Sequence, residues 1–184
     1  MGRSESSRVE IRGKTFTLDC TGTVLAAFYG GLGLDLARDF NRFTGNGVKR
    51  LYATLKQLNL LHRRKLPAPG DIIFWDNTWD ANEDGNFRND ELTHTGLVVA
   101  VDKDGTVSYI HAHIRRGVVR EVMNLALPRE REDAQGKPLN SPLALASAER
   151  RKTEEPSGGL SGNLWNSFGS AVRRKDYFAA PPPP

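Results

Sequence analysis

The chain has 184 residues, a formal net charge of +4 and one cysteine. A single cysteine excludes an internal disulfide and a cysteine-rich zinc site, and no apolar run is long enough to span a bilayer. The length suits one domain with a full core. The basic residues come in short clusters without interleaved aromatic side chains, so no nucleic-acid partner is expected.

The first third of the chain predicts a β-hairpin followed by three helices. Residues 9–18 alternate around Arg12-Gly13, which is typical of a hairpin. A helix is expected from Cys20 to the glycine pair at 30–31, and two amphipathic helices over 34–43 and 47–61.

The middle of the chain predicts antiparallel strands. Four apolar, β-branched runs are expected to be strands, at 71–75, 95–101, 106–112 and 117–123. The DKDG stretch at 102–105 is a turn signal that joins two of them. Helices followed by antiparallel strands indicate an α+β domain with N-terminal helices packed on a central sheet.

The C-terminal third is expected to be peripheral. The domain is expected to cover residues 1–127, and the polar composition of 128–159 predicts a linker or surface segment. Residues 160–176 regain an apolar stripe and are predicted to form a closing helix. The proline-rich residues 177–184 are predicted to be a disordered tail.

One cysteine and two histidines are candidates for catalysis. Cys20 follows Asp19 at the expected start of a helix, where the helix dipole favours a thiolate. His94 opens one strand and His111 closes the next, so antiparallel pairing would make them neighbours. The three residues together predict a nucleophile, a base and an orienting partner.

Other interpretations of these residues remain open. Cys20 could be a small core residue, and each histidine could be a hydrogen-bonded structural residue. Zinc binding by Cys20, His94, His111 and His113 is a further alternative. The pattern also leaves open whether His111 or His113 is the third member of the catalytic set.

Four motifs in this order resemble those of NlpC-type cell-wall cysteine peptidases and the related CHAP amidohydrolases. They are DCTGTVLAAFY, PGDIIFW, HTGLVVAV and YIHAH, which together extend from residue 17 to about residue 113. Thr21 stands where a serine is usual in that family. The aromatic-Gly-Gly stretch that usually precedes the cysteine is absent, and the expected hairpin takes its place.

The resemblance implies a papain-like fold in which Cys20 is the nucleophile, His94 the general base and His111 the orienting residue. It implies hydrolysis of amide bonds in peptidoglycan, with a muropeptide as substrate and no organic cofactor. A monomer is expected. Two alternatives are a cysteine-dependent acyltransferase and a calcium-dependent wall-binding module without turnover.

Residues 80–91 have the spacing of an EF-hand calcium loop inserted between two strands. Side-chain carboxylate or amide oxygens stand at loop positions 1, 3, 5 and 12, a backbone carbonyl serves at position 7, and a glycine at position 6 allows the sharp turn. The predicted Ca²⁺ ligands are Asp80, Asn82, Asp84, Asn86 and Glu91. An isolated loop of this kind binds weakly, in the range of extracellular modules. We therefore expect a cell-envelope location, periplasmic or secreted, although residues 1–8 show no signal-peptide pattern.

Overall fold

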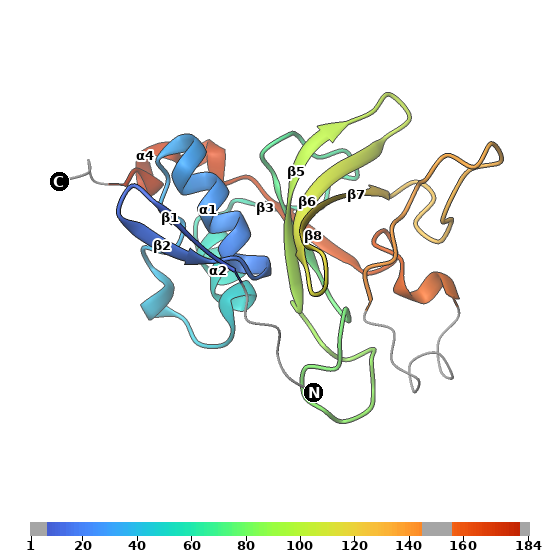
Figure 1. Ribbon diagram of the computed structural model, residues 1–184, viewed down its shortest axis with the longest axis horizontal. Helices are drawn as coiled ribbons and strands as arrows, with labels where there is room; N and C mark the ends of the chain where they lie inside the picture. Colours follow the sequence, from blue (N-terminus) through green and yellow to red (C-terminus); the bar gives the residue numbers. More distant parts are fainter. Residues whose placement is uncertain (1–6, 145–155, 181–184) are drawn as a thin grey trace.

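The computed structural model describes residues 7–144 and 156–180, and in them the chain has an α+β fold with a six-stranded antiparallel sheet and three helices (Figure 1). The strand order is β3-β8-β4-β5-β6-β7. The strands are β3 (Leu61–His62), β8 (Trp165–Gly169), β4 (Ile72–Trp75), β5 (His94–Val101), β6 (Thr106–His113) and β7 (Gly117–Asn124). A separate hairpin pairs β1 (Arg8–Ile11) with β2 (Lys14–Thr17), as the sequence predicts.

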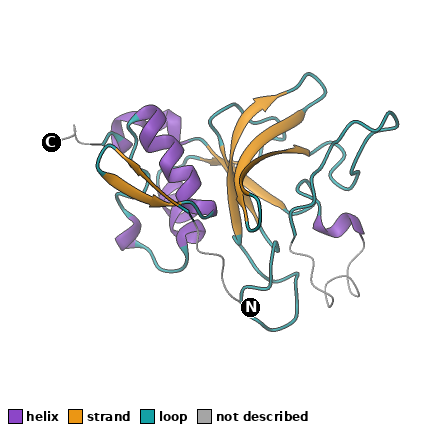
Figure 2. Cartoon of the chain, viewed as in Figure 1, coloured by secondary structure: helices purple, strands orange, loops and turns teal. Residues whose placement is uncertain are grey.

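The helices lie on one face of the sheet. They are α1 (Cys20–Leu32), α2 (Gly47–Gln57) and the short α4 (Lys175–Phe178), joined by 3-10 turns at η1 (Phe40–Arg42) and η3 (Ala171–Arg174). The segment that follows β7 covers the opposite face, where Figure 2 shows mostly loops and the 3-10 turn η2 (Pro156–Gly159).

The central sheet is buried on both faces, and β4 shows the alternation most clearly. Ile72 and Phe74 pack with α1 and α2, whereas Ile73 and Trp75 pack with β6, β7 and β8 on the other face. All four side chains are fully buried. Because both faces of β4 need apolar side chains, the run IIFW is continuous rather than alternating.

The start of α1 explains part of the DCTG motif by packing alone. Asp19 is the N-cap, and its side chain accepts a hydrogen bond of 2.7 Å from the Gly22 amide. A Cβ at Gly22 would lie 1.7 Å from the Thr17 carbonyl oxygen, so only glycine fits there. The prediction that Cys20 opens a helix is confirmed.

Two predicted helices differ from the structure. The 34–43 segment contains only the turn η1, because Leu34 forms an isolated bridge with Ala179 and the Asp35 side chain accepts from the Ala37 amide. The 47–61 helix ends at Gln57. The chain reverses at Asn59, which has a φ of 54°, and continues into β3.

The predicted closing helix over 160–176 is wrong for its first half. Residues 165–169 form β8, which is inserted between the edge strand β3 and β4. Only η3 and α4 that follow it are helical. The predicted tail begins too early, because Phe178 is fully buried in the helix-side core; residues 181–184 lie outside the described residues.

The segment after β7 is more than a polar linker. Leu139 and Asn140 are buried, and Ser141 exchanges two hydrogen bonds with Val122 of β7. The remainder of the predicted linker, residues 145–155, lies outside the described residues. Within residues 7–144 and 156–180, none of the helices combines the length and the apolar character needed to cross a membrane.

Candidate active site

The structure brings His94 and His111 together at one end of the sheet. His94 Nε2 lies 2.8 Å from His111 Nδ1, with the rings edge to face. β5 and β6 are adjacent and antiparallel, so the start of one lies beside the end of the other. The His94 ring also packs on Trp75, the residue opposite it on β4.

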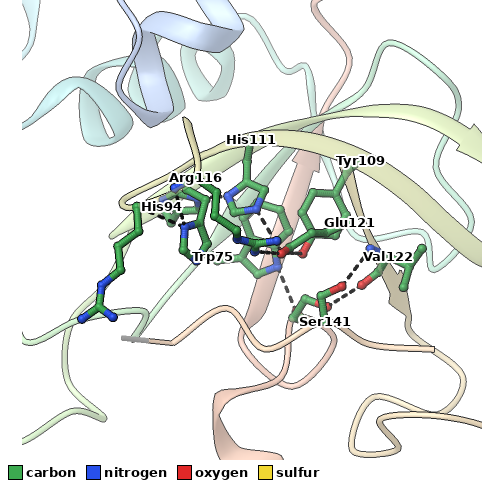
Figure 3. A network of polar contacts seen from close by, with 11 residues as sticks. Trp75, His94, Tyr109, His111, Arg116, Glu121, Val122 and Ser141 are labelled. Carbon is green, nitrogen blue, oxygen red and sulfur yellow. Dashed lines mark hydrogen bonds and ion pairs between the residues drawn. The ribbon is translucent and has the colours of Figure 1, made fainter. Parts of the chain in front are cut away.

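A carboxylate and a guanidinium extend this pair, and Figure 3 shows them in one network. Glu121 Oε2 accepts a hydrogen bond of 3.0 Å from His111 Nε2, and the Tyr109 hydroxyl donates to the same oxygen at 3.4 Å. Arg116 donates to the other carboxylate oxygen of Glu121. The polar groups therefore run from His94 through His111 and Glu121 to Arg116.

Sequence reasoning missed Glu121 and Arg116. Glu121 lies opposite Tyr109 in the β6–β7 register and is buried on the same face of β7 as Met123. The signal in the sequence was a charged residue at an inward-facing position of GVVREVM, two residues before an inward methionine. A buried carboxylate needs partners, which would have pointed to the histidine strand beside it.

The Cys20 sulfur lies beside the backbone at the start of β5, next to His94, but it has no hydrogen bond to the His94 side chain in the described structure. Its Sγ lies 3.9 Å from the Thr21 hydroxyl, and the backbone amide of Thr95, the residue after His94, also stabilises its thiolate. No hydrogen bond joins Cys20 to His94 in the part of the chain that the structure describes. The thiol is partly buried against the helix-side core, whereas the His94 ring packs on Trp75 of the opposite core. The two groups can therefore meet only around the end of β5.

The electrostatics differ from the predicted thiolate. Burial, reinforced by the charge of Asp19, raises the pKa of Cys20 to about 11. Burial, followed by the neighbouring His111, lowers the pKa of His94 to about 3. The resting pair at neutral pH is thus a neutral thiol and a neutral imidazole, because these environments outweigh the helix dipole.

The strand beside the pair leaves no room for larger residues. A Cβ at Gly96 would lie 2.8 Å from the Ile110 carbonyl oxygen and 3.1 Å from the Trp75 ring. The glycine of the HTG motif therefore allows β5, β6 and Trp75 to pack tightly. This close packing holds the start of β5, and with it His94, against Trp75 and β6.

The remaining histidines and tryptophans have other partners. His113 Nδ1 accepts from the amides of Arg115 and Arg116, which leaves His111 as the histidine bonded to His94. His62 packs beside Asp71, with Nε2 3.1 Å from the Asp71 Oδ2. Trp75 is fully buried, whereas Trp79 is 40% exposed.

An open hollow of about 280 Å³ adjoins the start of α1. Strand β2, the first turn of α1 and the start of α2 form its walls, with Asp19, Thr21 and Gly22 at the α1 side. Cys20 is not among its lining residues, because the Cys20 sulfur lies on the side of α1 that faces Thr95 of β5.

The predicted calcium loop has an ordered turn at its start. Asp80 accepts from the amides of Asp84 and Gly85, at 3.2 and 2.9 Å, and Asn82 accepts from the Asp84 amide. Glu83 and Gly85 both have positive φ, 60° and 80°. Hydrogen bonds from Asn89 and Asn86 lower the pKa of the Asp84 carboxyl.

The far end of the loop differs from the prediction. Glu91 is exposed, whereas the preceding Asp90 is 5% exposed and directs Oδ1 at the amides of Ala81 and Asn82. Asp90 Oδ2 is buried without a hydrogen-bond partner. An orphaned carboxylate oxygen beside loop positions 2 and 3 would suit a cation, which makes Asp90 the candidate closing acid in place of Glu91.

No group of three or more His, Cys, Asp or Glu residues is gathered as a metal site within residues 7–144 and 156–180. The alternative of a zinc site at Cys20, His94, His111 and His113 would need the sulfur and three imidazoles around one point, whereas Cys20 packs on the helix-side core and the His94 ring on Trp75 of the other core. A calcium site in the loop would have to draw on amide and main-chain oxygens as well as carboxylates, as such loops do.

Comparisons of the chain with protein-family models, with curated proteins and with solved structures found no match. The function proposed below therefore depends on the geometry of the site and on the motifs of the sequence.

Proposed function

We propose that the protein is a cysteine hydrolase with a papain-like fold of the NlpC and CHAP type, which cleaves amide bonds in peptidoglycan. Cys20 is the nucleophile, His94 the general base and His111 the residue that orients it. The observation that carries the proposal is the 2.8 Å contact between His94 and His111, beside the strand residue whose amide faces the Cys20 sulfur.

The hydrogen bonding of His94 leaves one of its ring nitrogens available to act as the base. His94 Nε2 is held by His111, so Nδ1 is the ring nitrogen left to take the thiol proton. The mechanism requires the Cys20 sulfur to reach that nitrogen around the end of β5, where His94 is the first residue of the strand. Hydrogen bonds at catalytic sites commonly shorten only when the substrate is bound.

The reaction then proceeds by acyl transfer. As the S–H proton passes to His94 Nδ1, the sulfur attacks the amide carbonyl carbon, and the Cys20 backbone N–H is the proposed donor to the oxyanion. The imidazolium returns its proton to the leaving amine when the C–N bond breaks. Water, deprotonated by His94, then hydrolyses the thioester and regenerates the thiol.

Calcium in the 80–91 loop would support this site from the side. The end of the loop is already tied to β4, because the Asn77 amide donates to the Asp90 carbonyl and the Thr93 amide to the Trp75 carbonyl. Thr93 directly precedes His94. An ion that ordered the loop would therefore stiffen the start of β5. Weak calcium affinity suits the cell envelope or the exterior, where we propose that the protein acts.

The test is incubation of purified muropeptides with the protein, followed by mass spectrometry of the products. We expect the wild type to release new amine and carboxyl ends, and Cys20→Ser to release none, because a hydroxyl is a far weaker nucleophile. Arg120→Gln, an exposed change on β7, should cleave like the wild type. Cleavage by Cys20→Ser at the wild-type rate, or none by the wild type, would contradict the proposal.

One observation favours a second candidate, a calcium-dependent wall-binding module without turnover. The thiol has a raised pKa and no hydrogen bond to His94 in the described part of the chain, which is the arrangement of an unused cysteine. Sedimentation with purified cell-wall sacculi separates the two. Binding that requires calcium, is unchanged in Cys20→Ser and is accompanied by no cleavage would favour the module.

A further inference from the structure

The buried carboxylate of Glu121 has no counterpart in the predicted catalytic set, yet it lies at the end of the histidine pair. It projects from β7, and its partners come from two further places, β6 and the turn that follows it. We define the histidine–carboxylate relay as His94, His111 and Glu121. The two contacts within it measure 2.8 and 3.0 Å.

Glu121 is a pure acceptor in this relay. Burial works to raise the pKa of its carboxyl, but hydrogen bonds from His111 and Arg116 outweigh burial, so the pKa lies below its ordinary value. Arg116 supplies the positive charge on one oxygen, with half of its own side chain in solvent. The carboxylate is therefore already paired without a second cation.

Because Arg116 already supplies the positive charge beside Glu121, the relay needs no imidazolium, and with both rings neutral every proton in it is determined. An ionised carboxylate accepts only, so His111 Nε2 must carry the hydrogen in that contact. A neutral imidazole has one N–H, which makes His111 Nδ1 an acceptor. The hydrogen of the 2.8 Å contact must then belong to His94 Nε2.

We propose that Glu121 is a positioning residue that selects the tautomers of both histidines, so that the ring nitrogen of His94 without a proton is Nδ1. That nitrogen is bonded to Cγ and lies near its own main chain. The sulfur of Cys20 approaches the same main chain at the Thr95 amide. Glu121 thus sets the tautomer of His94 through His111, without contacting His94 itself, and Arg116 keeps Glu121 ionised.

The direct test is nitrogen-15 NMR of the histidine rings, which distinguishes protonated from bare ring nitrogens. In the wild type above pH 7 we expect His94 to be bare at Nδ1 and protonated at Nε2. A proton on His94 Nδ1 would overturn the inference, since it would mean that His111 donates from both nitrogens. This readout needs no substrate, so it stands apart from the proposed hydrolase activity.

The Glu121→Gln variant should reverse the relay. Arg116 will attract the oxygen of the new amide, which leaves its NH₂ group facing His111 Nε2. His111 must then accept at Nε2 and donate from Nδ1, and His94 must hold its proton on Nδ1. We expect kcat on muropeptides to fall by about 100-fold or more with little change in KM, the contribution typical of a general base.

A double variant separates tautomer selection from simple damage to the fold. In Glu121→Gln with Arg116→Ala, the amide is free to turn its oxygen toward His111, so the wild-type tautomers and at least about tenfold of the lost kcat should return. Damage to packing would instead add in the double variant. Failure of both recoveries would overturn the inference. If muropeptides are not cleaved by any form but the spectra follow this order, the relay stands and the proposed substrate is wrong.

Discussion

The buried neutral imidazole of His94 predicts a loss of stability in mild acid. Its pKa is lowered from 6.5 to about 3 in the folded protein, first by burial and then by His111. A histidine whose folded pKa is depressed contributes its full stability above pH 6.5. As the pH falls below 6.5 the unfolded chain gains a proton that the folded protein does not take up, so stability is lost until about pH 3.

The size of the effect follows from those two values. Between pH 8 and pH 5 the linkage of this one group amounts to about 2 kcal/mol of unfolding free energy. Because the side chain keeps some contact with solvent, this figure is an upper bound. For a chain of this size it corresponds to a fall in Tm of about 4–8 °C.

The assay is urea unfolding at both pH values, in the wild type and in His94→Gln. The variant lacks the titrating group, while the carboxylates and the other histidines remain, so subtraction isolates His94. We expect the wild type to lose about 2 kcal/mol more than the variant between pH 8 and pH 5. An equal loss in both proteins would refute the assignment of a buried, neutral His94.

Three further predictions concern the start of α1 and the calcium loop. With its pKa near 11 rather than 9.0, Cys20 should react with iodoacetamide at pH 8 about 100-fold more slowly in the native protein than in urea. The native rate should keep rising tenfold per pH unit up to pH 10. If steric shielding alone slowed the reaction, the native rate would instead level off near pH 9, as the rate of the unfolded chain does. Asp19→Ala should lower the free energy of unfolding by about 1 kcal/mol in chemical denaturation, because the cap to the Gly22 amide is lost. Asp19→Asn can still cap, so it should cost little stability, and it should speed alkylation of Cys20 by removing the charge. Equal stability of the two variants would contradict the cap. Calcium at about ten times its Kd should raise Tm by about 3–6 °C relative to the protein in a chelator. This rise should be lost in Asp90→Asn and retained in Glu91→Gln. The opposite result for the two variants would show that Glu91 is the ligand instead.

The parts of the fold that sequence predicted are those governed by local signals. The hairpin, the start of α1 and the strands β4 to β7 each have alternation, a cap or a turn residue of their own. The meeting of His94 and His111 followed from antiparallel pairing across the turn at 102–105. Both histidines lie at strand ends, where register decides their neighbours.

The parts that were missed depend on long-range partners. The run LWNSFG has an apolar spacing that suits a helix or a short strand, and only its place between β3 and β4 decides for the strand. Glu121 meets His111 through pairing of β6 with β7, and its ionised state depends on Arg116 from the turn between them. The raised pKa of Cys20 comes from packing against the core, which a helix start by itself does not reveal.

The place of β8 has a consequence for how the protein is made. A nascent polypeptide that has emerged from the ribosome only as far as β7 holds β4 with one open edge and β3 with no neighbour in the sheet. The part of the chain that emerges after β7 must therefore insert a strand between β3 and β4, a slow, non-local step during which the unpaired N–H and C=O groups of the open edge are exposed to association with other chains. Premature termination before residue 165 should therefore yield an aggregating product rather than a smaller stable domain.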